Sequence, residues 1–197
     1  MKGLWNDRYS KKEYAYGTEP NAFLKSQLLK LRPGKILFPA EGEGRNSVFA
    51  ATLGWDVVAF DNSTEGRRKA LELATNRAVT IDYRLESYDD FEDRAGTYDA
   101  IGLVFAHASA AHRASYHQKF IQLLKPGGRI ILEGFSTKQL GNTSGGPKII
   151  EMLFDEAILR DDFGSLTEIE ITEADTELNE GVFHTGSASV IRLIGTK

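Results

Sequence analysis

Two glycines that follow a short apolar run are the first residues whose types and spacing suggest chemistry. The run KILFP at residues 35–39 leads directly into AEGEGRN at residues 40–46. Glycines at such a place let a strand turn sharply into a helix N-terminus and let a ligand approach the backbone closely. GEGRNS nearly satisfies the GxGxxG pattern, with Ser47 in the last position. The alternative is a tight turn that binds nothing.

Asp61 closes the next apolar run, DVVAFD at residues 56–61. In nucleotide-binding α/β folds, an acid at the end of the second strand accepts hydrogen bonds from both ribose hydroxyls. Alternatively, Asp61 caps the helix that follows it. Together, the glycine loop and this acid indicate a cofactor that contains adenosine.

The elements that must position these residues alternate between strands and helices. Strands are predicted at 35–39, 56–61, 78–85, 98–106 and 129–135, and helices at 45–53, 62–75 and 111–124. Continuous apolar strands are typical of a parallel sheet covered on both faces. Two further strands, 166–178 and 188–194, have only a glycine-bearing connection between them, which predicts an antiparallel hairpin. The sequence therefore predicts an α/β fold, a Rossmann-like three-layer sandwich with a mostly parallel seven-stranded sheet and a C-terminal antiparallel hairpin.

Composition narrows the possible functions. With 28 acidic and 24 basic residues the net charge is -4, which argues against nucleic acid as a partner. The chain has no cysteine, which excludes disulfides, zinc-thiolate sites and cysteine nucleophiles, and we expect no metal. The N-terminus has no apolar signal core, and no apolar stretch approaches the roughly 18 residues of a membrane helix. We therefore expect a cytoplasmic protein that does not enter a membrane.

Four segments carry a resemblance to a known family. KILFPAEGEGRNS, VVAFDNS, YDAIGLVFAH and LLKPGGRIILEGF, in this order, resemble the successive motifs of class I S-adenosylmethionine (SAM)-dependent methyltransferases over nearly the whole chain. The N-terminal segments WNDRY, EYAYG and PN resemble the small TehB-like group, related to tellurite and thiopurine methyltransferases. The resemblance implies an enzyme (EC 2.1.1.-) that transfers a methyl group from SAM to a small molecule and releases S-adenosylhomocysteine (SAH).

The resemblance also implies where SAM binds. Gly42 and Gly44 would lie beneath its methionine part, and Asp61 would hold its ribose. Glu41 would either supply a carboxylate to the SAM amino group or be a solvated loop acid, because the family's usual acid is replaced by Phe38 or Pro39. Glu86 or Ser87 would take the place of an adenine-binding Asp. The full set of expected cofactor residues is Ala40, Glu41, Gly42, Gly44, Arg45, Asn46, Asp61, Asn62, Glu86, Ser87, Phe105, Trp5, Tyr9 and Tyr16.

The acceptor side is less well defined. Phe105 and His107 follow the fourth strand, where class I enzymes bring side chains toward the transferred methyl. His107 and His184 are the histidines expected near the substrate, as catalytic bases or as structural residues. His112 and His117 are expected on the surface of the next helix, and the basic cluster at 66–69 on a solvated helix face.

One domain is predicted for residues 1–197. An N-terminal helical lid at 1–30 precedes a cofactor-binding core at 35–135, and 136–197 form a substrate-side loop, helix and hairpin. Two alternatives remain open: a protein that binds SAM or SAH without catalysis, and an NAD(P)-dependent Rossmann oxidoreductase. The oligomeric state is expected to be a monomer or homodimer, and the acceptor atom is oxygen, nitrogen, sulfur or a metalloid.

Overall fold

The computed structural model describes residues 2–197, and these form two compact units. The first extends to Glu92 and includes Glu180–Phe183, and the second comprises Asp93–Asn179 and His184–Lys197. Within residues 2–197, no helix is both long and apolar enough to cross a membrane. The single-domain organisation and its three subdivisions stay predictions.

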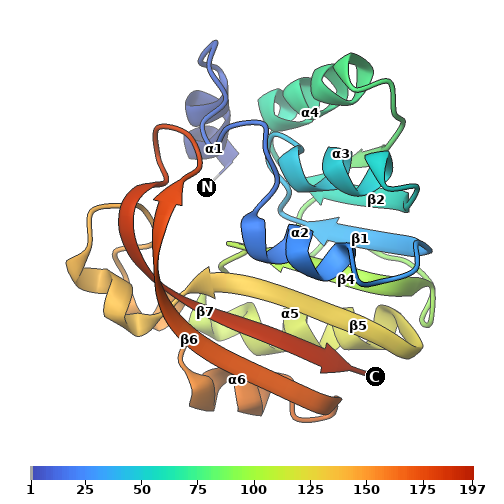
Figure 1. The fold of residues 1–197 in the computed structure, drawn as a ribbon, viewed down its shortest axis with the longest axis vertical. Coiled ribbons are helices and arrows are strands. Elements are labelled where there is room, and N and C mark those ends of the chain that lie inside the picture. Colours follow the sequence, from blue (N-terminus) through green and yellow to red (C-terminus); the bar gives the residue numbers. More distant parts are fainter. Residues whose placement is uncertain (1) are drawn as a thin grey trace. The chain divides into compact units, whose positions relative to one another are not determined.

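The first unit is built on three parallel strands (Figure 1). These are β1 (Lys35–Pro39), β2 (Asp56–Asp61) and β3 (Asp82–Leu85), joined by α3 (Arg45–Thr52) and α4 (Thr64–Asn76) and preceded by α1 (Lys2–Tyr9) and α2 (Ala22–Leu28). The side chains of Phe38, Phe60 and Phe91 are fully buried, and the rings of Phe60 and Phe91 stack with their centroids 4.3 Å apart. Phe38 and Phe60 therefore anchor β1 and β2 in the core of this unit, and Phe91, which follows β3, packs on β2.

The ends of α4 explain where the predicted boundaries differ from the observed ones. Ser63 is the N-cap, and its Oγ accepts a hydrogen bond from the Gly66 N–H at 3.0 Å, so the helix begins at Thr64. After the helix, Ala78 adopts a left-handed conformation with φ of +55°. This turn uses the residues that were predicted to begin the third strand, so β3 starts at Asp82 instead of residue 78.

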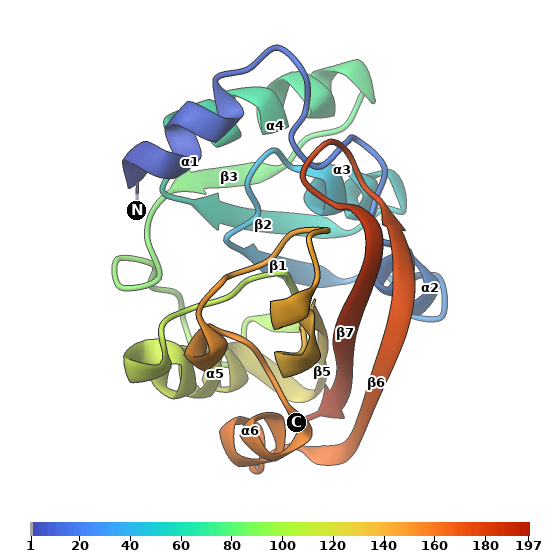
Figure 2. The ribbon, with the colours of Figure 1, turned by 90° about the vertical axis from the view of Figure 1, so that its left-hand side faces the viewer.

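The second unit contains the remaining four strands. β4 (Tyr98–Val104) pairs in parallel with β5 (Leu124–Phe135), which pairs with β7 (Thr185–Thr196) and through it with β6 (Thr167–Asn179) in antiparallel fashion. Figure 2 shows β6 and β7 as long neighbouring strands. The predicted hairpin is confirmed, and pairing from Asn179↔Thr185 to Thr167↔Thr196 makes its second strand longer than the sequence predicted. The helical elements are α5 (Ala110–Leu123), η1 (Thr137–Gly141), η2 (Ile150–Met152) and α6 (Glu156–Asp162).

The strand order is β3-β2-β1-β4-β5-β7-β6. It combines a parallel series with a C-terminal antiparallel hairpin, as the alternation of apolar runs predicted. The Rossmann-like α/β fold class is therefore confirmed.

A buried acid connects α5 to α6 in the second unit. The Asp162 carboxylate accepts hydrogen bonds from Arg113 Nε at 2.7 Å and from His117 Nδ1 at 2.8 Å, and its side chain is 1% exposed. The prediction that His117 lies on the surface is wrong, since its ring is buried and stacks on Phe163. Burial lowers the pKa of His117 against the opposing effect of Asp162, so the contact is a hydrogen bond from a neutral imidazole.

Replacing Asp162 with alanine should destabilise the second unit. The substitution leaves the buried His117 and the partly buried Arg113 without their acceptor, so we expect a loss of about 3 to 5 kcal/mol in the free energy of unfolding measured with urea. Asp161→Ala is the matched control, because Asp161 is the exposed neighbour. Equal losses from the two variants would contradict a stabilising role for this cluster.

The same cluster gives stability a defined pH dependence. Burial alone would raise the pKa of Asp162, but hydrogen bonds from His117 and Arg113 outweigh burial and lower it. A carboxylate with a lowered folded-state pKa contributes its full stability above its unfolded pKa of about 3.9 and loses it as the pH falls further. The stability difference between wild type and Asp162→Ala should therefore shrink below about pH 4.

Candidate functional site

The peptide of Gly42 is held from both sides in the first unit. Its N–H donates to Asp61 Oδ2 at 3.1 Å, and its carbonyl oxygen accepts a hydrogen bond from the Tyr83 hydroxyl at 2.5 Å. Gly42 has φ of +61°, which glycine adopts without the steric cost that other residues meet. Side chains from β2 and β3 thus fix the turn that follows β1. Tyr83 was not among the predicted site residues, although the alternation in IDYRL places it on the buried face.

Asp61 holds more than the glycine turn. Its Oδ1 accepts the N–H of Ser63 at 2.8 Å, and the residue is buried, with 8% of its surface exposed. Burial raises the pKa of Asp61, and hydrogen bonds from the backbone N–H groups of Ser63 and Gly42 oppose the rise. Ser63, not Asp61, caps α4, which removes the alternative capping role for Asp61. Each carboxylate oxygen can accept a second hydrogen bond, so a ribose diol remains a possible partner.

Gly44 is explained by packing within the chain. A Cβ added to Gly44 would lie 2.5 Å from the Cβ of Ala70 on α4, and φ at Gly44 is +87°. The missing side chain therefore lets α3 and α4 approach each other. This requirement holds without any ligand, so the glycine itself is not evidence for SAM.

The predicted N-terminal aromatic residues lie on this same unit. Tyr9 is buried, and a Cβ on Gly42 would meet its hydroxyl oxygen at 2.6 Å. Trp5 stacks on Tyr9 with ring centroids 5.6 Å apart, and the Tyr16 hydroxyl accepts a hydrogen bond from Arg8 at 2.7 Å. The end of α1 therefore packs against the glycine turn.

One carboxylate oxygen of Glu41 binds the backbone at the start of α3. Its Oε1 accepts the N–H groups of Asn46 at 2.9 Å and Ser47 at 2.6 Å, so it satisfies the free donors at the start of α3. Burial raises the pKa of Glu41 to about 7, although these N–H groups oppose the rise. This oxygen of Glu41 is therefore occupied by α3, and the role of its carboxylate toward the SAM amino group stays a prediction.

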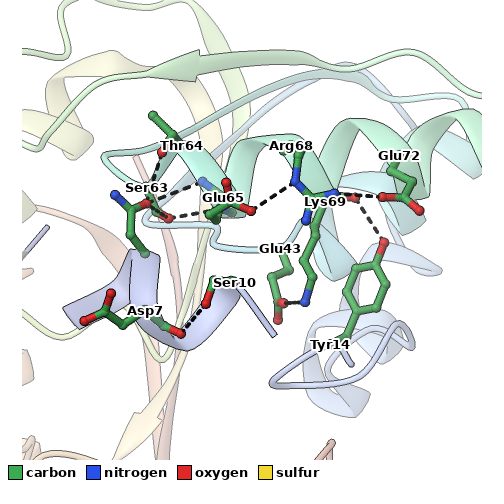
Figure 3. Close-up of polar contacts among 12 residues, drawn as sticks. Asp7, Ser10, Tyr14, Glu43, Ser63, Thr64, Glu65, Arg68, Lys69 and Glu72 are labelled. Atoms are coloured by element: carbon green, nitrogen blue, oxygen red, sulfur yellow. Dashed lines mark hydrogen bonds and ion pairs between the residues drawn. The ribbon is translucent and has the colours of Figure 1, made fainter. Parts of the chain in front are cut away.

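A buried ion pair fastens the N-terminal segment to the loop (Figure 3). Lys69 Nζ contacts Glu43 Oε1 at 2.7 Å, with both side chains 3% exposed, and also donates to the Glu13 carbonyl oxygen at 2.6 Å. The other Glu43 oxygen accepts the N–H of Ala15 at 2.7 Å. The prediction that residues 66–69 form a solvated face is wrong for Lys69. Its helical spacing with Gly66 and Leu73 on the buried face of α4 was the available signal.

The predicted cofactor residues of this unit outside the N-terminal segment fall into three places. At the start of α3, Asn46 Oδ1 accepts the Asn21 N–H at 2.9 Å, and Arg45 pairs with Glu180 at 2.9 Å. After β3, the Ser87 hydroxyl donates to Asp90 at 2.6 Å, with Glu86 beside it in the same turn. The residues at the glycine turn and β2 end are Ala40, Glu41, Gly42, Gly44, Asp61 and Asn62.

The three remaining predicted residues, Phe105, His107 and His184, lie together in the second unit. Phe105 follows β4 with φ of +50°, a strained conformation for a non-glycine residue. Its ring centroid is 4.6 Å from those of both Phe135 and His184. Residues 2–197 contain no group of three or more His, Cys, Asp or Glu side chains that could hold a metal ion.

His107 is locked by backbone groups on both sides of its ring. Nδ1 lies 2.7 Å from the Met152 carbonyl oxygen, and Nε2 accepts the Phe135 N–H at 3.1 Å. Burial lowers its pKa to about 4. The ring is therefore neutral with its proton on Nδ1, and neither nitrogen is free to take a proton from a substrate. This geometry contradicts a role for His107 as a catalytic base. The same role for His184 stays a prediction.

Comparison with protein families identifies the segment that contains the glycine turn. Residues 36–128 match a family model described as a methyltransferase domain. No curated protein matches the chain.

Solved structures share the fold at low sequence identity. One, from work on the conversion of a disulfide bond into a thioacetal group during echinomycin biosynthesis, is 14% identical with a TM-score of 0.79 and covers 100% of this chain and 91% of its own. TehB from Haemophilus influenzae is 18% identical with a TM-score of 0.73, covering 100% of this chain and 66% of its own. Magnesium protoporphyrin IX methyltransferase from Synechocystis PCC 6803 with bound SAH is 17% identical with a TM-score of 0.65, covering 88% of this chain and 81% of its own.

The close contact between Gly44 and Ala70 can be tested by comparison with Gly54, which has a similar φ. Gly54 has φ of +89° but open space where a Cβ would lie, whereas Gly44 faces Ala70. Gly54→Ala should cost about 1 to 2 kcal/mol from its dihedral angles alone. Gly44→Ala should cost about 1 to 3 kcal/mol more, because the added methyl group overpacks the contact. Urea unfolding measures both, and equal costs would contradict the packing role of Gly44.

The state of His107 can be read by NMR. We expect the 15N shifts of its ring to show the neutral form with the proton on Nδ1 and no titration between about pH 5 and pH 8. The exposed His112 serves as the internal reference for a histidine in contact with solvent. A titration of His107 near pH 6.5 would restore it as a candidate base.

Proposed function

We propose that this protein, whose residues 36–128 match a methyltransferase domain, is a class I SAM-dependent methyltransferase that transfers the methyl group of SAM to a small-molecule acceptor. The observation that carries the proposal is the Gly42 peptide, held between Asp61 and Tyr83 where β1 ends. A rigid, left-handed glycine turn beside a buried carboxylate suits an adenosine cofactor at the carboxyl end of a parallel strand.

The residues present fit SAM. Asp61 keeps acceptor capacity for a ribose diol after its two backbone contacts, and Arg45 Nη1 is a buried donor without a hydrogen-bond partner among the described residues. When bound, SAM supplies an activated methyl group on a sulfonium, so the chain's task is to bind, orient and exclude water. Methyl transfer to a good nucleophile needs no elaborate set of catalytic side chains. The proposal is therefore consistent with a His107 ring whose two nitrogens are both bonded to the backbone.

The acceptor side belongs to the proposal as well. The net charge of -4 favours a small molecule over nucleic acid, and the N-terminal segments support membership of the TehB-like group. Phe105 and His184, in contact within the second unit, are the proposed acceptor-side residues. A cytoplasmic location and a monomeric or homodimeric state remain parts of the same proposal.

Ligand binding separates the cofactor hypotheses. SAH should bind in calorimetry and raise the melting temperature, because a ligand specific for the folded state adds about 2.7 kcal/mol of stability at 100 times its Kd. NAD at the same concentration should do neither. Binding of NAD without binding of SAH would overturn the proposal in favour of an oxidoreductase.

A further inference from the structure

Arg45 is a buried charge whose hydrogen bonds are incomplete. It is 6% exposed and opens α3 directly after Gly44. Its Nη2 pairs with Glu180 at 2.9 Å, whereas Nη1 is buried and has no hydrogen-bond partner among residues 2–197. A charged N–H group that is buried and unpaired is destabilising, and a ligand that supplies an acceptor for it would remove this cost.

The surroundings of Arg45 place its charge beside the glycine turn. The positive charge of Arg45 opposes the rise that burial causes in the pKa of Glu41 and in the pKa of Tyr16. Glu41 belongs to the turn, and Tyr16 belongs to the N-terminal segment that Glu43 and Lys69 hold in place. The guanidinium therefore acts on both segments that border the proposed cofactor site.

We infer that Nη1 of Arg45 binds the carboxylate of the methionine part of SAM and SAH. This inference rests on the proposed function. A guanidinium forms its strongest hydrogen bonds with carboxylates, and one edge of this fork is already occupied by a carboxylate, that of Glu180. The adenosine part of SAM carries no anion, so only the amino-acid end supplies the matching group. An anionic acceptor would offer the same chemistry from a different source.

The test is a cycle of two ligands and two proteins measured by calorimetry. The ligands are SAH and S-adenosyl-3-thiopropylamine, which lacks only the carboxylate of SAH. Wild type should bind SAH about ten-fold to a hundred-fold more tightly than the decarboxylated ligand. Arg45→Gln should lose this preference by weakening SAH alone, so that the two ligands bind with affinities within about two-fold of each other.

Glu180→Gln is the matched control. It breaks the same Arg45 ion pair but leaves the guanidinium in place, so the preference for SAH should persist. If Arg45→Gln weakens both ligands equally, Arg45 has a structural role and the inference is wrong. If wild type binds the two ligands equally, the inference fails even when no Arg45 variant folds. That outcome would mean that the carboxylate of SAH is solvated and that the group which binds Arg45 comes from an anionic acceptor.

The cycle also distinguishes failure of the inference from failure of the proposed function. If wild type binds neither ligand, both fall, because the chain then has no SAM site. If wild type binds both ligands with equal affinity, the cofactor assignment stands and only the role of Arg45 is overturned.

Discussion

The hydrogen bonds on the two sides of the Gly42 peptide are the interactions on which the candidate site depends. Asp61 accepts from the N–H, and Tyr83 donates to the carbonyl oxygen. Because these side chains come from neighbouring strands, the parallel pairing of β2 with β3 sets the geometry of a loop that follows β1. The turn is therefore organised by the sheet before any ligand binds, which lowers the entropic cost of binding.

A buried ion pair extends this organisation to the N-terminus. Glu43 and Lys69 are almost fully buried, and each also bonds to the backbone of residues 13–15. A buried pair of charges adds little net stability over apolar packing, but loss of one partner is costly. Because Lys69 lies on α4 and Glu43 lies in the glycine turn, the pair joins the N-terminal segment to both. Tyr9, which belongs to this segment, packs directly against Gly42 in the glycine turn.

The sequence predicted the strands and the hairpin well because apolar periodicity and glycine-containing turns are local signals. It could not reveal that Gly44 is required by Ala70, that Glu41 caps α3, or that His107 is locked by Met152 and Phe135, since each depends on segments brought together by folding. The resemblance to class I methyltransferases indicated which residues lie at the cofactor positions, but not which groups of the chain they bond to. Tyr83 and Lys69 were not predicted because their hydrogen-bond partners lie far away in the sequence. Without those partners, a polar residue on a buried face cannot be distinguished from one that only packs in a strand or helix.

Calorimetric binding of SAH to Tyr83→Phe tests the central claim most directly. The substitution removes one hydroxyl that donates to the Gly42 carbonyl oxygen. Tyr14→Phe is matched to it, because the Tyr14 hydroxyl donates at 3.1 Å to another backbone oxygen of the same unit, that of Lys69. If the sheet organises the turn for SAM, Tyr83→Phe should weaken SAH about five-fold to ten-fold, the equivalent of one neutral hydrogen bond, and Tyr14→Phe should leave it unchanged. Equal affinities in the two variants would contradict the account.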